Sequence, residues 1–234
     1  MKNQYFGDVN DYQKYGLLRI LSGYGALKTG VCWMLTANDG RSNGKFVSYL
    51  DSPLKWRGFD PELYDSLSRT VKIDKKRQVG QAEIRGILPN TIFYEKLLED
   101  DASQRQDYFF NTLRYFEDVD LIFFDPDNGL EIKSSKRGRK NSCKFLFWDE
   151  VEDAFNNGHS VLIYQHFPRK ERTGFIKRIS EELGSRLVVN EIFSFKTRNV
   201  VFFLVPQKNN LSHFRCQTNV VEKIWGKEIK NFAL

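Results

Sequence analysis

An apolar stretch that stops abruptly at a cluster of acids constrains this chain most. Residues 119–124 read Val-Asp-Leu-Ile-Phe-Phe, and residues 125–131 continue Asp-Pro-Asp-Asn-Gly-Leu-Glu. A buried parallel strand that ends in a loop has this pattern. Because ligands of open α/β sheets bind beyond the carboxyl ends of the strands, Asp125 is a candidate site residue. Pro-Asp-Asn-Gly is also good turn chemistry, so a plain turn is the alternative interpretation.

The rest of the chain alternates between patterns typical of strands and of helices. The closing pair, residues 186–195 and 199–206, reads as two strands whose short connection permits only an antiparallel hairpin. We therefore predict an α/β fold, a Rossmann-like three-layer sandwich with a mostly parallel sheet that ends in an antiparallel C-terminal hairpin. We expect one domain over residues 1–234, with a small insertion around residues 54–90. The other predicted strands are 30–35, 46–53, 70–73, 91–94, 119–124 and 159–168, and the predicted helices are 11–22, 61–68, 101–117, 147–157, 174–183 and 218–230.

Composition excludes several classes of protein. Hydrophobic residues make up 41% of the 234 residues and aromatic residues 15%, which argues against a disordered chain. No apolar run approaches 18 residues and the first residues lack an apolar signal core, so we expect neither a membrane partner nor secretion. Cys32, Cys143 and Cys216 are odd in number and far apart, which favours free thiols and a cytoplasmic location over disulfides or zinc. The net charge of +6 is compatible with a polyanionic partner.

Several polar segments are placed where a site could form. The predicted strand 159–168 ends in Gln165 and His166, so His166 should lie at the same sheet edge as Asp125. The small, polar, glycine-containing stretch 36–44 follows the first strand, where nucleotide-like cofactors approach the backbone, although it is not the G-x-G-x-x-G motif. Asp11 and Lys14 share one face of the first helix, and a surface ion pair is the simplest explanation.

The strongest basic segment is residues 133–140, with five basic residues in eight. Such a loop beside a site could hold a nucleic-acid backbone through phosphate contacts, or it could be a solvated surface loop. A second basic cluster over residues 72–77 reads as a solvated face.

Taken in order, these motifs resemble those of the RlmJ-type adenine-N6 methyltransferases of large-subunit ribosomal RNA. The family motif Gly-Asn-x-x-Asp-x-x-Lys-His is similar to residues 7–15, and the catalytic Asp-Pro-Pro-Tyr is similar to residues 125–128. Looser similarities cover residues 35–40, 49–53 and 164–168. The resemblance implies an S-adenosylmethionine-dependent methyltransferase that acts on a nucleic acid, RNA or DNA, with adenine N6 as an expected acceptor.

The resemblance also implies a role for individual residues. Asp125 would accept a hydrogen bond from the amine to be methylated, and the Pro126 carbonyl would accept the other. Asp127 and Asn128 stand where the family has the second Pro and the aromatic residue that stacks on the flipped base. Either another aromatic residue serves, with Phe167 as one candidate, or the acceptor is not a base, or methylation has been lost. The full expected sets are Asp125, Pro126, Asp127 and Asn128 for catalysis, Lys14, Asn38, Gly40 and Ser52 for S-adenosylmethionine, and His166, Phe167, Arg137 and Arg139 for the substrate.

Two alternatives remain open at this stage. Asp125, Asp127 and Glu131, with His166, could bind a divalent metal and serve a nuclease or another phosphotransfer enzyme, because hard oxygen ligands suit magnesium or manganese. The chain could also be a noncatalytic relative that only binds nucleic acid.

Overall fold

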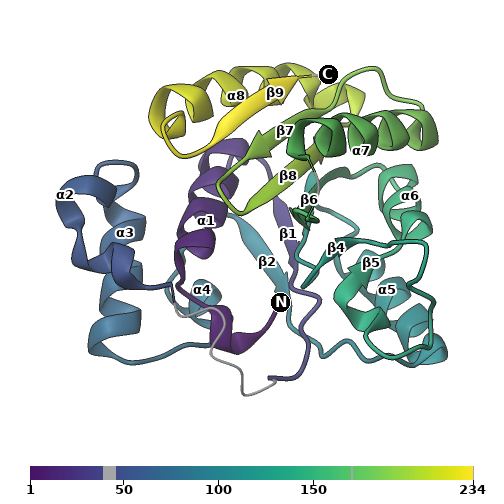
Figure 1. Ribbon diagram of the computed structural model, residues 1–234, viewed down its shortest axis with the longest axis horizontal. Coiled ribbons are helices and arrows are strands. Elements are labelled where there is room, and N and C mark those ends of the chain that lie inside the picture. Colours follow the sequence, from purple (N-terminus) through teal and green to yellow (C-terminus); the bar gives the residue numbers. More distant parts are fainter. Residues whose placement is uncertain (39–45, 170, 234) are drawn as a thin grey trace.

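The computed structural model describes residues 1–38, 46–169 and 171–233, and its centre is one twisted sheet (Figure 1). In these residues the sheet has seven strands in the order β2-β1-β3-β6-β8-β7-β9. The pairs β2/β1, β1/β3 and β3/β6 are parallel, and the pairs β6/β8, β8/β7 and β7/β9 are antiparallel. Five of these seven strands run in one direction and β8 and β9 run in the other, so the predicted mostly parallel sheet with a C-terminal antiparallel hairpin is confirmed. The strands are β1 (Thr29–Cys32), β2 (Thr91–Tyr94), β3 (Leu121–Phe124), β6 (Ser160–His166), β7 (Phe193–Lys196), β8 (Val200–Val205) and β9 (Lys230–Ala233).

Helices cover both faces of the sheet, which gives the expected three layers. On one face α1 (Val9–Leu21), α3 (Pro61–Ser68) and α8 (Leu211–Trp225) share a hydrophobic core with the strands. On the other face lie α5 (Ala102–Tyr115), α6 (Trp148–Asn156) and α7 (Arg172–Leu187) (Figure 1). Strand β3 feeds both layers because successive side chains alternate: Phe123 belongs to the first core and Phe124 to the second.

Helix α1 is enclosed nearly all round. Asp8 caps it by accepting hydrogen bonds from the backbone N–H groups of Asn10 (2.9 Å) and Asp11 (3.0 Å). Every residue from 11 to 21 is buried. Gly16 lets α8 approach closely, because a Cβ atom at this position would lie 2.2 Å from the Trp225 ring. A helix packed this tightly carries its polar residues, including Lys14, into the interior.

Between β1 and β2 the described elements are helices, joined by loops. This part of the chain contains a 3₁₀ turn (Ser48–Asp51), α2 (Pro53–Trp56), α3, a π-helical turn (Arg69–Ile73) and α4 (Gln81–Ile84). The strands predicted for 46–53 and 70–73 are therefore wrong. The β-branched residues at 70, 71 and 73 favour a strand locally, but the helix continues through them, and the Thr70 hydroxyl donates to the carbonyl of Ser66 (2.7 Å).

Two predicted elements near the C-terminus also have different bounds. Helix α7 continues to Leu187, so the strand predicted from 186 begins only at Phe193. The helix predicted for 218–230 begins earlier, at Leu211, and ends at Trp225, after which residues 230–233 form the edge strand β9 beside β7. Across residues 1–38, 46–169 and 171–233, no helix combines the length and the apolar character that a membrane span requires.

The strand order predicts a crevice at the carboxyl ends of the central strands. Strand β1 pairs with β2 on one side and with β3 on the other, so the chain reverses its direction of winding at β1. In doubly wound folds such a reversal opens a crevice at the carboxyl ends of the central strands, where ligands bind.

Candidate functional site

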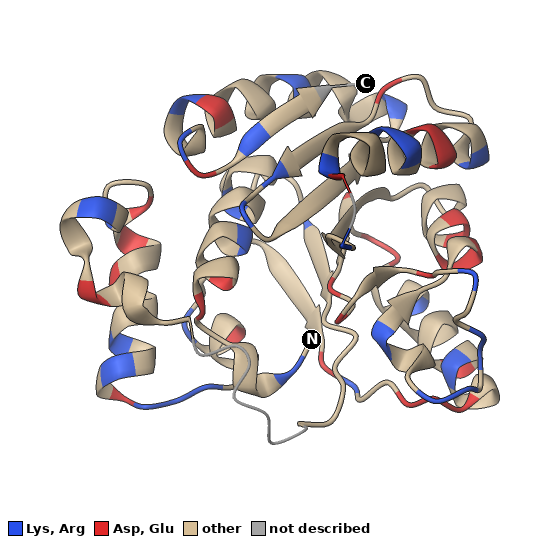
Figure 2. Cartoon of the chain, in the orientation of Figure 1, with Lys and Arg blue, Asp and Glu red and all other residues tan. Residues whose placement is uncertain are grey.

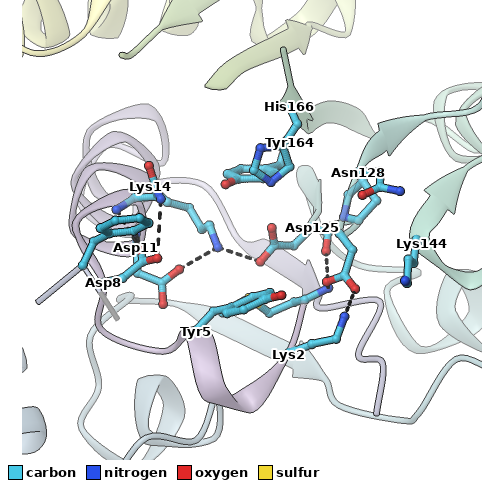
Figure 3. Close-up of a pocket in the computed structure, with 15 residues that line it drawn as sticks. Lys2, Tyr5, Asp8, Asp11, Lys14, Asp125, Asn128, Lys144, Tyr164 and His166 are labelled. Carbon is cyan, nitrogen blue, oxygen red and sulfur yellow. Dashed lines mark hydrogen bonds and ion pairs between the residues drawn. The ribbon is translucent and has the colours of Figure 1, made fainter. Parts of the chain in front are cut away.

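A cavity of about 390 Å³ lies at the carboxyl ends of β3 and β6, within the size range of small-molecule sites. The acidic loop after β3 forms one wall, and β6, α1 and the N-terminal segment form the others (Figure 3). The structure brings six of the predicted site residues together here. They are Lys14, Asp125, Pro126, Asp127, Asn128 and His166.

Lys14 links α1 to the end of β3. Its Nζ atom lies 2.8 Å from Asp11 Oδ1 and 2.7 Å from Asp125 Oδ2, and its side chain is only 2% exposed (Figure 3). The ring of Tyr164 lies beneath the ammonium group, with 5.0 Å between Nζ and the ring centroid. Asp11 and Lys14 do share a helix face, as their spacing indicates, but the surface ion pair expected from it is in fact buried, because α1 is enclosed.

Burial and charge together set the protonation of this cluster. Burial disfavours the charged form of Lys14, but the adjacent Asp11 and Asp125 carboxylates outweigh it and raise the pKa of Lys14. Burial raises the pKa of Asp125, although Lys14 opposes the shift. Burial and the nearby Asp11 raise the pKa of Asp8 to about 7. One acid of the cavity wall therefore changes its charge near neutral pH.

Asp127 is held by different cations. Its carboxylate forms ion pairs with the Lys2 ammonium group and with the Met1 amino nitrogen, the latter at 3.0 Å, and accepts a hydrogen bond from the Thr36 hydroxyl at 2.8 Å. Burial opposes ionisation, but the two cations outweigh it and lower the pKa of Asp127. The N-terminal segment therefore lies across the ends of β1 and β3. Lys2 and Thr36 could not be identified from the sequence, because both lie far from residue 127 along the chain and no motif connects them to it.

The backbone of the acidic loop is fixed by Gln165 of β6. The Gln165 side-chain oxygen accepts from the Leu130 N–H (2.8 Å), and its amide donates to the Asn128 carbonyl (3.2 Å). Gly129 makes this approach possible, because its φ is +109° and a Cβ atom there would lie 2.3 Å from the Gln165 oxygen. Among the described residues no group donates a hydrogen bond to the Pro126 carbonyl, so this oxygen remains available as an acceptor.

Four aromatic or imidazole rings line the cavity, and Phe167, which the sequence suggested for stacking on a base, is not among them. Tyr5, Phe46, Tyr164 and His166 lie in the walls, and the ring of His166 stands edge-on to Tyr164 with centroids 5.1 Å apart. Phe167 instead packs against Phe175 in the core of the opposite layer, with ring centroids 6.1 Å apart. The structure therefore does not bring Phe167 to the cavity, because it follows β6 on the face that α7 covers.

The remaining predicted cofactor residues are not in the cavity wall. Asn38 is exposed and its side-chain oxygen lies 3.4 Å from the Gln4 backbone nitrogen. Ser52 is exposed between a 3₁₀ turn and α2. Gly40 lies outside the described residues. The stretch 36–44 follows a strand, as the pattern of cofactor loops requires, but its described residues 36–38 do not line this cavity.

The predicted substrate-binding arginines also lie outside the cavity. Arg137 forms an ion pair with Asp149 and its guanidinium lies 4.6 Å from the Phe147 ring centroid. Arg139 is exposed. Both lie in the segment between β4 (Gly129–Leu130) and β5 (Phe145–Leu146), a small parallel pair.

The acids required for a metal site are not gathered. Glu131 accepts a hydrogen bond from the Trp148 N–H (2.9 Å) at the start of α6 and does not line the cavity. Asp125 and Asp127 are engaged by different cations. Within the described ranges no group of three or more His, Cys, Asp or Glu residues is arranged to hold a metal ion.

Comparisons with known proteins add little to this geometry. No family model matches the chain, and no curated protein matches it. Among solved structures, the crystal structure of protein LPL1258 from Legionella pneumophila str. Philadelphia 1, of the family DUF519, is similar with a TM-score of 0.48 and 10% sequence identity. The similarity covers 98% of this chain and 96% of that chain. The function must therefore be argued from the site.

Proposed function

We propose that this protein is an S-adenosylmethionine-dependent methyltransferase that modifies an exocyclic amine of a nucleic-acid base, with adenine N6 as the expected acceptor. The observation that carries the proposal is the buried Asp125–Lys14 pair at the carboxyl end of β3, followed by a carbonyl that is free to accept. Asp125 and Pro126 stand together at a cavity beside the topological switch point.

Two acceptors suit the chemistry of an exocyclic amine. Conjugation with the purine ring makes this nitrogen a poor nucleophile, and its two N–H groups must be held so that the lone pair leaves the ring plane. Lys14 engages Asp125 Oδ2, while Asp125 Oδ1 has no partner among the described residues and can accept one N–H. The Pro126 carbonyl can accept the other. This alignment, together with an anionic group near the nitrogen as it gains positive charge, accounts for most of the expected rate enhancement.

The cavity also suits the cationic methyl donor. When bound, S-adenosylmethionine supplies an electrophilic methyl group on a positively charged sulfur. Asp8 in the cavity wall forms no ion pair among the described residues, whereas the other three aspartates of the wall and the faces of its two tyrosine rings already contact Lys2 or Lys14. Asp8 is therefore the carboxylate that fits the sulfonium of the donor.

The nucleic-acid part of the proposal is supported by charge and by the rings. The net charge is +6, and the chain between β4 and β5, of which Lys144 lines the cavity, is rich in lysine and arginine. Tyr5 and His166 offer ring surfaces to a base in the cavity, in place of the aromatic residue missing from positions 125–128.

Calorimetric titration with S-adenosylhomocysteine tests the cofactor. We expect saturable binding near micromolar, about −8 kcal/mol. Absence of binding at high protein concentration would refute the methyltransferase proposal, and the noncatalytic nucleic-acid-binding alternative would then be the one to pursue.

Transfer of a radiolabelled methyl group to RNA and DNA oligonucleotides tests the acceptor. Asp125→Asn should reduce transfer by at least about 100-fold, because the amide keeps the shape but loses the charge. The exposed Asp118→Asn serves as the matched control and should keep wild-type transfer. Replacing adenine by purine, which lacks the exocyclic amine, should abolish labelling. Equal labelling of the two oligonucleotides would show that N6 is not the acceptor.

A further inference from the structure

The chain between β4 and β5 carries a group of cations that form no ion pair. Four of them are exposed and Lys144 is half-buried, whereas the buried cations Lys14, Arg19 and Arg105 are paired with acids. Arg137 within this stretch is also paired, with Asp149. Figure 2 shows basic residues along the loop between β4 and β5, beside α5 and α6. The side chains without a partner, which we name the basic segment, are Lys133, Lys136, Arg139, Lys140 and Lys144.

Lys144 connects this segment to the cavity. It is half-buried in the cavity wall beside Asn128, opposite Lys14 (Figure 3). The other two lysines of the cavity, Lys2 and Lys14, already pair with Asp127 and Asp125. Lys144 is therefore the cavity lysine whose charge a bound anion would neutralise.

The backbone that carries Lys144 is fixed on one side by Asp100. The Asp100 carboxylate accepts hydrogen bonds from the backbone N–H groups of Asn141 (2.7 Å) and Cys143 (2.9 Å). The Lys144 carbonyl in turn accepts from the Asn128 N–H (2.9 Å), which ties the segment to the acidic loop.

A buried arginine fixes the same backbone from the other side. Arg105 of α5 is 1% exposed and pairs with Glu150 of α6 at 2.6 Å. It also donates to the carbonyls of Ser142 (3.2 Å) and Phe145 (2.6 Å). A buried ion pair is costly to desolvate and is weak evidence of added stability by itself. Here it holds the backbone at residues 142 and 145, on either side of Lys144.

We propose that the basic segment is the phosphate-binding track for a single-stranded nucleic acid, with Lys144 contacting the phosphate next to the nucleotide whose base enters the cavity. Lysine ammonium groups on flexible stems suit this role, because they act as point charges toward phosphate oxygens. A single strand is favoured because a base that enters a cavity must leave its stack, which costs least where no partner strand holds it. The identity of that base rests on the proposed function, but the phosphate contacts do not.

Salt-dependent binding tests the track directly. The probe is a fluorescently labelled single-stranded RNA of roughly 20 nucleotides, with DNA of the same sequence as a second arm. Each lost phosphate contact should reduce the slope of log K against log salt by about 0.7. Lys144→Gln should therefore lower the slope by about 0.7, and a fourfold variant with Gln at positions 133, 136, 139 and 140 by up to about 2.8. Weaker binding of the DNA alone would identify the ribose as a further contact and leave the track supported.

Charge-matched variants provide the control. Lys208→Gln removes one exposed lysine, and a fourfold variant with Gln at 177, 208, 223 and 227 removes four from α7, α8 and the adjoining turns. These variants should keep the wild-type slope. Equal loss in the control and track variants, an unchanged slope in the track variants, or no binding of either strand by the wild-type protein would overturn the proposal. Wild-type binding of S-adenosylhomocysteine is a separate readout, so the track can stand where the methyltransferase proposal fails, and the reverse.

Discussion

Replacing Lys14 by methionine removes one charge from a buried cluster while keeping a side chain of similar length. Asp11 would retain donors, since the Gly7 N–H lies 2.9 Å and the Tyr15 hydroxyl 3.3 Å from its Oδ2 atom. Asp125 would lose the only side-chain donor that contacts its carboxylate among the described residues. At 2% exposure water reaches little of this carboxylate, so in the folded variant it should take up a proton.

The free-energy cost of protonating Asp125 determines how much stability the Lys14→Met variant loses. An unfolded aspartate has a pKa near 3.9, so holding a proton at pH 7 spans about 3 pKa units, or about 4 kcal/mol. At pH 5 the same step costs about 1.5 kcal/mol. The folded variant binds a proton that its unfolded chain releases, so its stability falls as the pH rises above 4. We therefore expect Lys14→Met to lower the free energy of unfolding by about 4 kcal/mol at pH 7, within the usual range for breaking a buried pair, and by much less at pH 5.

Urea unfolding followed by tryptophan fluorescence at both pH values measures this loss. Lys72→Met is the matched control, because its pair with Asp51 is partly exposed and should contribute less than about 1 kcal/mol. Adding Asp125→Asn to Lys14→Met should recover part of the loss, because no stranded carboxylate then remains. Equal losses in Lys14→Met and Lys72→Met, or a Lys14→Met loss that does not shrink at pH 5, would refute the reasoning.

Three further predictions concern the surroundings of this cluster. Asp8→Asn keeps an N-cap acceptor but removes a carboxyl whose pKa burial raises to about 7. Between about pH 4 and pH 7 the native wild type holds a proton there that its unfolded chain has lost, so the wild type loses stability over this range and the variant does not. The variant should therefore be more stable than the wild type by roughly 1–4 kcal/mol at pH 8 and no more stable at pH 4, as urea titrations at both pH values can check. Gly129→Ala should cost about 1–3 kcal/mol by thermal melting, through its positive φ and the contact with Gln165, whereas Gly58→Ala, with open space around it, should cost far less. Arg105→Met leaves Glu150 buried without its cation and should cost about 3–5 kcal/mol; Arg57→Met, which breaks an exposed pair with Asp65, should change the melting temperature little.

Features that depend on strand periodicity could be predicted from the sequence. The run 121–124 is apolar on both faces, and a strand buried on both faces has to lie inside a sheet that helices cover on either side. Asp125 and His166 lie at the carboxyl ends of the adjacent parallel strands β3 and β6, so the topology alone places them at the same end of the sheet.

Features that depend on tertiary packing could not be predicted. Lys14 has its second carboxylate partner 111 residues away, and only the burial of α1 converts the expected surface pair into an interior one. Phe167 has an aromatic side chain in the right part of the sequence, but the face on which it falls depends on where α7 packs. Residues 70–73 have strand propensity, but the helix that precedes them determines their conformation.

The long sequence separation of the contacts that build the cavity has a consequence for folding kinetics. Lys2 meets Asp127 across 125 residues and Lys14 meets Asp125 across 111. Pairing of β1 with β3 closes a loop of similar length, and these side chains can meet only after that entropy has been lost. We expect these contacts to be absent from the folding transition state. Lys2→Met should then speed unfolding and leave the folding rate almost unchanged, which places its φ-value near zero. A partly folded chain would have its sheet before it has its cavity, and any ligand that binds there would recognise only the fully folded protein.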